Sequence, residues 1–128
     1  MAVSRKKAAE KAEISTNQNI KDIIIQALME KLGRDIVDID MKGMDNVIFD
    51  DFIVCTATSK PHAETLCDYV RELAWKVAHQ KPYFVEGLEN KEWIILDFFN
   101  VIVHIFLQET RDFYNLENLW SDAEITRF

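Results

Sequence analysis

The sequence predicts an α/β (α+β) domain with a single mixed β-sheet and helices packed on it. Three observations support this class. The chain has 128 residues, 48% of them apolar, which suits one domain with one core. Two stretches repeat apolar residues at helical spacing. Several short apolar or alternating runs between and after them have the length of strands.

The first half of the chain is predicted to contain two helices and two strands. The first helix carries an apolar stripe and ends at Gly33, since glycine commonly follows the last helical turn. A short strand is expected over residues 35–41. Residues 49–58 contain an uninterrupted apolar run, which is typical of a central strand buried on both faces. Thr58 or Ser59 is expected to cap the second helix, which has the clearest amphipathic pattern in the chain.

The second half is predicted to be rich in strands and to end in short helices. Residues 83–86 form a short strand, and residues 93–97 and 101–107 form two strands joined by a tight connection. Short helical turns are expected over residues 109–114 and 116–120. The predicted order is therefore α-β-β-α-β-β-β-α.

The predicted domain spans residues 15–122, with a tail on either side. Residues 1–14 are polar, rich in Lys, Ala and Glu, and predicted to be a disordered tail. Their net charge of +2 leaves open an alternative role as a basic anchor for RNA. Residues 123–128 are expected to be a C-terminal tail.

Charge and composition exclude several classes of function. The net charge is −7, and from Glu86 onward nine acids face only three bases. Such a surface repels phosphate, so little or no direct nucleic-acid binding is expected, whereas a basic protein is a suitable partner. No apolar run reaches 18 residues, so no membrane span is expected. Cys55 and Cys67 lie in apolar surroundings and suggest free thiols in a reducing cytoplasm.

Three carboxylates suggest one catalytic hypothesis. Asp38 and Asp40 form an acid-x-acid pair on a strand, and Asp97 is a third strand acid. Nucleotidyltransferases use three such groups to hold two divalent ions. Those enzymes also need a Gly-Ser loop for the phosphates, and none precedes Asp38. A divergent nucleotidyltransferase using Asp38, Asp40 and Asp97 is therefore kept as the alternative, and solvated acids on a strand are favoured.

Other residue types give no sign of catalysis. His62, His79 and His104 do not have the spacing of metal ligands, and the two cysteines occupy core-type positions. There is no phosphate-binding loop or nucleophile motif, and three glycines leave little material for one. We expect a protein that is not an enzyme and needs neither a metal nor a cofactor.

The two strands over 93–97 and 101–107 offer a candidate binding face. If Asp97 lies opposite Ile102, then Ile95 faces His104 and Trp93 faces Phe106, all on one side. The other side is uniformly aliphatic and belongs against the helices. A sheet face that carries aromatic and polar groups resembles a binding hot spot. The alternative is that a C-terminal helix covers the two aromatic rings.

Seven blocks of the chain resemble the ribosomal silencing factor (Iojap-like) family, in the right order, from about Asn19 to Asp122. The blocks are Leu32-Gly33-Arg34-Asp35-Ile36-Val37, Asp51-Phe52-Ile53-Val54, Thr56-Ala57-Thr58-Ser59, Val85-Glu86-Gly87, Glu92-Trp93-Ile94-Ile95-Leu96-Asp97, Val101-Ile102-Val103-His104-Ile105-Phe106 and Arg111-Asp112-Phe113-Tyr114-Asn115-Leu116-Glu117-Asn118-Leu119-Trp120. Each block alone is weak, but the ordered set is specific.

The resemblance implies a nucleotidyltransferase-like fold without the catalytic motif. It also implies binding to large-subunit ribosomal protein fourteen, on the surface that meets the small subunit. Occupying that surface would block subunit joining and repress translation, and organellar relatives serve in ribosome assembly. The contact residues implied for this chain are Trp93, Asp97, Phe99, Asn100, His104, Phe106, Glu109 and Arg111. A blander alternative is a scaffold that forms a homodimer through the same face.

The turn after Asp97 departs from the family pattern. The family usually has an aromatic residue, a glycine and an acid there, whereas this chain has Phe98, Phe99 and Asn100. Losing the glycine makes a positive φ costlier, although Asn tolerates it better than most residues. A salt bridge cannot be assumed at Asn100, and Phe99 offers apolar contact instead.

Overall fold

The computed structural model describes residues 20–128, so the tail predicted over residues 1–14 lies outside the described part. A helix covers residues 20–30, and nine further strands and helices follow it. They are β1 (Arg34–Asp40), β2 (Asp51–Ala57), α2 (Lys60–Ala78), β3 (Phe84–Glu86), β4 (Trp93–Asp97), β5 (Val101–Leu107), α3 (Gln108–Tyr114), α4 (Leu116–Leu119) and β6 (Glu124–Arg127).

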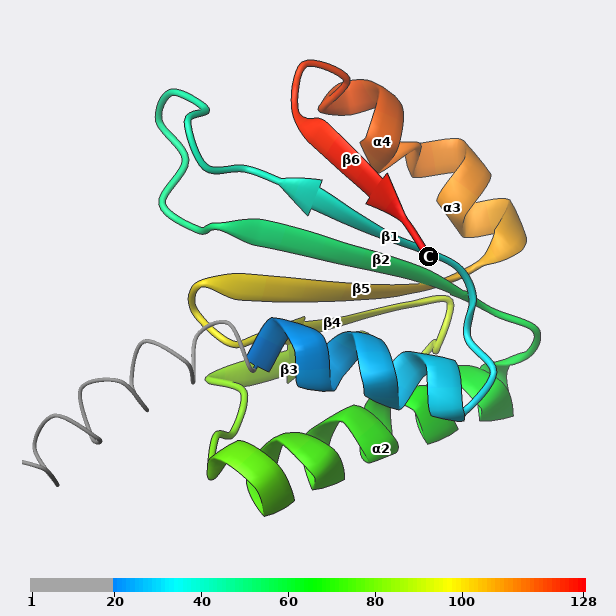
Figure 1. Ribbon diagram of the computed structural model, residues 1–128. Helices are drawn as coiled ribbons and strands as arrows, with labels where there is room; N and C mark the ends of the chain where they lie inside the picture. The colour runs from blue at the N-terminus through cyan, green and yellow to red at the C-terminus, as the bar shows by residue number, and fades with distance from the viewer. Residues whose placement is uncertain (1–19) are drawn as a thin grey trace, which may run out of the picture.

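The six strands form one mixed sheet in the order β3-β4-β5-β2-β1-β6 (Figure 1). The central pair, β2 and β5, is parallel, and all the other neighbours are antiparallel. Every residue of β2 is buried, as its continuous apolar run predicts for a strand covered on both faces. The predicted single mixed sheet is confirmed.

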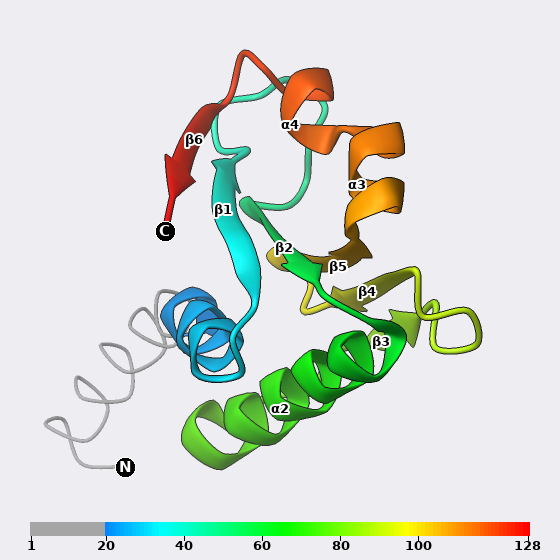
Figure 2. The ribbon, with the colours of Figure 1, turned by 90° about the vertical axis from the view of Figure 1, so that its right-hand side faces the viewer.

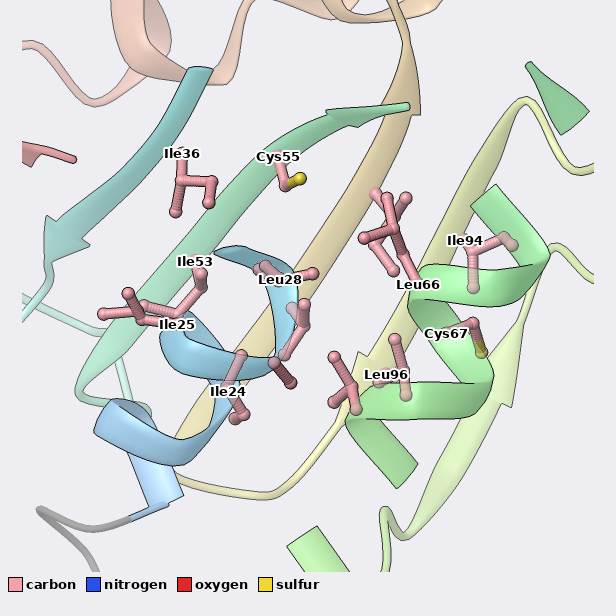
Figure 3. Close-up of a cluster of buried hydrophobic side chains, with 14 of the residues drawn as sticks. Ile24, Ile25, Leu28, Ile36, Ile53, Cys55, Leu66, Cys67, Ile94 and Leu96 are labelled. Carbon is pink, nitrogen blue, oxygen red and sulfur yellow. The ribbon is translucent and has the colours of Figure 1, made fainter. Parts of the chain in front are cut away.

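The helix over residues 20–30 and α2 cover one face of the sheet (Figure 2). Aliphatic side chains from these helices meet those of the strands in the larger core, part of which is drawn in Figure 3. Leu28 and Leu66 come from the two helices, and Ile53, Ile94 and Leu96 come from the sheet. Each is fully buried, and burial of such a side chain contributes about 1.5–3 kcal/mol. This face therefore supplies most of the hydrophobic stabilisation.

The opposite face has a smaller core over β1, β2 and β5. Val37, Val54 and Phe106 lie at its centre, and Leu116 and Trp120 from the α4 region pack on it. In Figures 1 and 2 α3 and α4 lie on this side of the sheet, away from α2. These helices are short, so they do not cover the whole face.

The predicted cap of α2 is confirmed at Ser59. Its Oγ accepts a hydrogen bond from the His62 backbone N–H at 3.1 Å, and this satisfies one of the free amides of the first turn. At the other end of α2, His79 adopts a left-handed conformation with φ of 53° and closes the helix. The strand that follows α2, β3, lies at the edge of the sheet.

The predicted C-terminal tail is wrong, because residues 124–127 form β6. This strand pairs with β1 in antiparallel register, with Ile125 opposite Ile39, and Ile125 packs against the smaller core. The backbone N–H of Phe128 donates to the Ile36 carbonyl at 2.9 Å. A short segment with a single aliphatic residue has no pattern that predicts a strand. It becomes one because the outer edge of β1 offers backbone groups with which it can pair.

Candidate functional site

The predicted register of β4 and β5 is confirmed. Asp97 lies opposite Ile102, Ile95 opposite His104, and Trp93 opposite Phe106. The intervening residues, such as Ile94 and Ile105, point into the larger core. The alternation of the two strands therefore separates an aliphatic side, which stabilises the fold, from a mixed side.

Part of this mixed side is left uncovered, and we call it the open sheet face. It spans β3, β4 and the start of β5, where antiparallel pairing places Phe84 beside Asp97 and Asp97 beside Ile102. Phe84 is exposed, and the β4 and β5 members are partly exposed. Its members are Phe84, Glu86, Trp93, Ile95, Asp97 and Ile102.

The turn between β4 and β5 presents an aromatic ring at one end of the open sheet face. Phe99 has a φ of 78°, a left-handed conformation that costs an L-residue roughly 1–2 kcal/mol. Its backbone N–H donates to Asp97 Oδ1 at 2.7 Å, so the carboxylate holds the turn. The Phe99 side chain is 58% exposed and lies 5.9 Å from the Tyr83 ring between centroids. A strained turn that holds an apolar side chain in solvent is a mark of a binding site.

An aromatic stack runs down from the surface at the other end of the face. Tyr114 of α3 packs on Trp93 with 4.6 Å between centroids, and Trp93 packs on Phe106 at 4.9 Å. Trp93 is partly exposed, but Phe106 is fully buried. The prediction that Phe106 makes direct contact with a partner is therefore wrong. The alternative of a covering helix holds in part, because Tyr114 of α3 covers Trp93, and Trp93 in turn covers Phe106.

His104 is also buried rather than exposed at a rim. Its Nδ1 accepts a hydrogen bond from the Trp93 indole N–H at 3.0 Å, which places the imidazole proton on Nε2. Nε2 has no hydrogen-bond partner among the described residues, although the Phe52 ring lies edge-on with centroids 4.5 Å apart. Burial lowers the pKa of His104 to about 3, so the ring is neutral. His104 orients the indole instead of meeting a partner.

Arg111 is a structural residue as well. Its guanidinium donates to the Asp35 carbonyl at 2.6 Å and to Thr56 Oγ1 at 2.7 Å, and it forms an ion pair with Glu117 at 3.2 Å. The side chain is buried, so its predicted contact with a partner is also wrong. The three bonds join α3 and α4 to β1 and β2, and thereby hold Tyr114 over Trp93.

The remaining predicted contact residues reach solvent at two separate places. Asp97, Phe99 and Asn100 lie at the β4–β5 turn, and Asn100 is partly exposed. Glu109 is exposed on the first turn of α3, beyond the far end of β4. Sequence reasoning missed Phe84 and Tyr114. Pairing of β3 with β4 would have predicted Phe84 beside Asp97, whereas the position of Tyr114 depends on how α3 turns back onto the sheet.

The three carboxylates proposed for catalysis do not converge. Asp97 lies on the open sheet face, whereas Asp38 forms an ion pair with Lys21 of the first helix at 3.2 Å, on the opposite face. Strands β5 and β2 separate β4 from β1. Asp40 is paired with Lys42 at 3.2 Å. The geometry that a nucleotidyltransferase would need from these three residues is absent.

Asp38 instead belongs to a charge cluster beneath the first helix. Lys21 also lies 3.6 Å from Asp51, and Lys42 lies 3.4 Å from the same residue. Burial, reinforced by the neighbouring Asp51 carboxylate, raises the pKa of Asp38 to about 7. Within residues 20–128, no group of three or more His, Cys, Asp or Glu side chains is arranged to hold a metal ion. The two lysines occupy the space between the acids.

The two thiols are unsuited to nucleophilic chemistry. Cys55 and Cys67 are buried and unbridged, and burial raises their pKa values to about 12 and about 11, which makes both poor nucleophiles at neutral pH. No helix in the described part of the chain is both long and apolar enough to cross a membrane. The open sheet face is thus the feature that suits a partner.

Known proteins resemble this chain in both sequence and structure. The profile of a family described as "Ribosomal silencing factor during starvation" matches residues 14–127. Ribosomal silencing factors of Halalkalibacterium halodurans and Bacillus subtilis are each 30% identical to it over 84% of this chain, and over 91% and 90% of their own lengths. A crystal structure of a Chromobacterium violaceum protein superposes with a TM-score of 0.75 at 33% identity, covering 81% of this chain and 85% of the other.

Proposed function

Because this chain belongs to the ribosomal silencing factor family, we propose that it binds the large ribosomal subunit through ribosomal protein fourteen of that subunit. Occupying that position keeps the small subunit from joining, and translation is repressed. The protein acts in the cytoplasm by its bulk alone, so the mechanism makes no bond and needs no cofactor. A mouse relative named for the assembly of the mitochondrial large ribosomal subunit, 28% identical over 78% of this chain, supports the choice of subunit and a role in ribosome biogenesis.

The open sheet face is the observation that carries this proposal. Its apolar members, Phe84, Ile95 and Phe99 at the adjoining turn, reach solvent on a rigid sheet rather than on a loose loop. Aromatic groups held in this way lose little side-chain entropy when a partner covers them. Trp93 lies among them with its orientation fixed by His104. The face is therefore preorganised for contact with another protein.

Charge supports a basic partner. Glu86 and Asp97 lie on the open sheet face, and Glu109 lies beyond its far end. The whole chain carries a net charge of −7. Acidic groups at the edge of an apolar contact steer a cationic surface into register and discourage approach to bare ribosomal RNA. A basic ribosomal protein meets both conditions.

Substitution of Phe99 by glycine separates binding from folding. Phe99→Gly removes the exposed ring but relieves the positive φ, so we expect the melting temperature to stay the same or rise. Binding to isolated large subunits is expected to weaken by about tenfold, as for loss of an aromatic contact worth about 1.4 kcal/mol. The measurement is co-sedimentation with large and with small subunits, together with a subunit-joining assay.

Leu32→Gly is the matched control. Leu32 is also exposed, apolar and at a positive φ of 63°, but it follows the first helix and lies away from the open sheet face. It should share the effect on melting temperature and keep full binding. Equal binding of Phe99→Gly and the unmodified protein, or preference of the unmodified protein for small subunits, would refute the proposal.

A further inference from the structure

A pocket of about 340 Å³ lies between the start of β4 and α3, beside the aromatic stack. Glu109 and Phe113 are four residues apart on α3, as are Thr110 and Tyr114, so each pair lies on one side of the helix. The strands supply Glu92 just before β4 and Leu107 at the end of β5. The lining residues are Glu92, Leu107, Glu109, Thr110, Phe113 and Tyr114.

Two aromatic rings form one wall of this pocket. Phe113 and Tyr114 meet edge to face, with centroids 5.0 Å apart, and remain 80% and 48% exposed. Tyr114 is fixed by its contact with Trp93, so the wall is continuous with the open sheet face. Because the Phe113 ring is so exposed, much of its apolar surface is in contact with water. A bound ligand would cover this surface.

Two carboxylates line the pocket, and the nearby bases are engaged elsewhere. Neither Glu92 nor Glu109 has an ion-pair partner within residues 20–128. Lys91, next to Glu92 in the chain, pairs with Glu64 of α2 on the other side of the sheet. Arg111 of α3 is buried and points toward Asp35, Thr56 and Glu117. The pocket therefore keeps two uncompensated negative charges beside two aromatic faces.

We infer that this pocket receives one arginine side chain of the ribosomal partner, an inference that rests on the function proposed above. A guanidinium is flat, so it stacks on the Phe113 or Tyr114 ring while its N–H groups donate to the carboxylates of Glu92 and Glu109. Its charge compensates acids that this chain leaves unpaired. A lysine ammonium provides charge but no flat surface, and a neutral side chain uses neither acid.

The test compares two double variants, each of which replaces two glutamates by glutamine, so that both have the same net charge. Glu92→Gln/Glu109→Gln removes both pocket charges, and Glu72→Gln/Glu89→Gln removes two exposed charges that do not line the pocket. Dissociation constants for isolated large subunits are measured between about 50 and 300 mM salt, a range over which exposed charges become strongly screened. The pocket variant is expected to bind about 10–100-fold more weakly at low salt, with a flatter salt dependence. The control is expected to stay within about twofold.

Two further variants test the aromatic wall. Phe113→Ala is expected to weaken binding by about tenfold, because it removes a stacking surface, whereas Phe113→Tyr retains a ring and should bind normally. Phe113 is highly exposed, so neither change should affect folding. Normal binding by Phe113→Ala would overturn the inferred stacking.

Carbodiimide cross-linking distinguishes arginine from lysine, because this reagent joins carboxylates to amines and not to guanidinium groups. A cross-link to the large subunit that mass spectrometry maps to Glu92 or Glu109 of the unmodified protein would place a lysine in the pocket and overturn the inference. If the unmodified protein binds and Phe99→Gly weakens it, but the pocket variant matches its control, only the pocket assignment fails. If the unmodified protein does not bind large subunits, the proposed function itself fails.

Discussion

Replacing Arg111 by methionine tests whether this residue holds the fold together or contacts a partner. Methionine has a similar length but no charge and no N–H group. The change removes hydrogen bonds to the Asp35 carbonyl and to Thr56 Oγ1 and the ion pair with Glu117. It leaves the Glu117 carboxylate without its cation in a partly buried position, where Oε1 already has no partner within the described residues.

The expected loss of stability is about 3–5 kcal/mol, the usual cost of removing one member of a buried ion pair. A domain of this size unfolds with a total of about 5–15 kcal/mol, so Arg111→Met would retain only part of its stability. The melting temperature should fall by roughly 4 °C for each kcal/mol lost. The effect should also loosen Tyr114, because α3 loses its connection to β1 and β2.

Urea denaturation of Arg111→Met, Glu117→Leu and the double variant provides the measurement. The double variant should be more stable than the sum of the single losses predicts, because it leaves no unpaired carboxylate behind. If Arg111→Met loses less than about 1 kcal/mol, the buried network contributes little and the reasoning is refuted. The same holds if the two losses simply add.

Two further predictions concern a buried imidazole and a tight turn. His104 has a pKa of about 3 in the folded protein, so the unfolded chain takes up its proton first and stability falls as pH drops below about 6.5. Between pH 6.5 and 5 this costs about 2 kcal/mol. His104→Asn keeps an acceptor for the indole and should not lose this stability at low pH, as measured by urea denaturation. If the stability of the variant and of the unmodified protein falls in parallel with pH, the assignment is contradicted. Asp38 contributes to stability with the opposite pH dependence, but it is present in both proteins and cancels in the comparison. Gly87→Ala should lose at least about 2 kcal/mol, since its φ is +89° and a Cβ would overlap the Trp93 carbonyl oxygen. Gly43→Ala, at φ of +90° with open space around it, should lose only about 1 kcal/mol in the same assay, and equal losses would refute the steric argument.

The strands and helices could be predicted wherever the local sequence pattern favours the same structure as the packing of the whole fold. The β4–β5 register follows from alternation and a short loop, because slipping by one residue would turn Ile94 and Leu96 out of the core. The buried run of β2 and the cap at Ser59 are equally local signals. β6 lacks such a signal, because only Ile125 among its four residues is aliphatic. Its pairing is decided by β1, almost ninety residues earlier in the chain.

The candidate site was harder to predict because exposure is a property of the whole fold. Alternation correctly places Trp93, His104 and Phe106 on one face, but it cannot show that α3 folds back and sets Tyr114 on Trp93. A charged residue such as Arg111 is usually exposed, and only the converging Thr56 and Glu117 explain its burial. Asp97 and Phe99 were predictable because a hairpin turn reaches solvent in almost any arrangement.

The parallel pairing of β2 with β5 sets a condition on how the chain folds. Phe52 meets Ile102 fifty positions later, and Ile39 meets Ile125 at an even greater separation. Contacts between residues so far apart in sequence require a long loop to close, with its loss of chain entropy, before the contact can stabilise the fold. Folding should therefore take milliseconds to seconds rather than microseconds. During synthesis β2 emerges well before its central neighbour, with α2 following it closely. The nascent chain therefore passes through a stage in which β2, which is fully buried in the folded protein, has an unprotected edge. At that stage chaperone binding or aggregation would compete with folding.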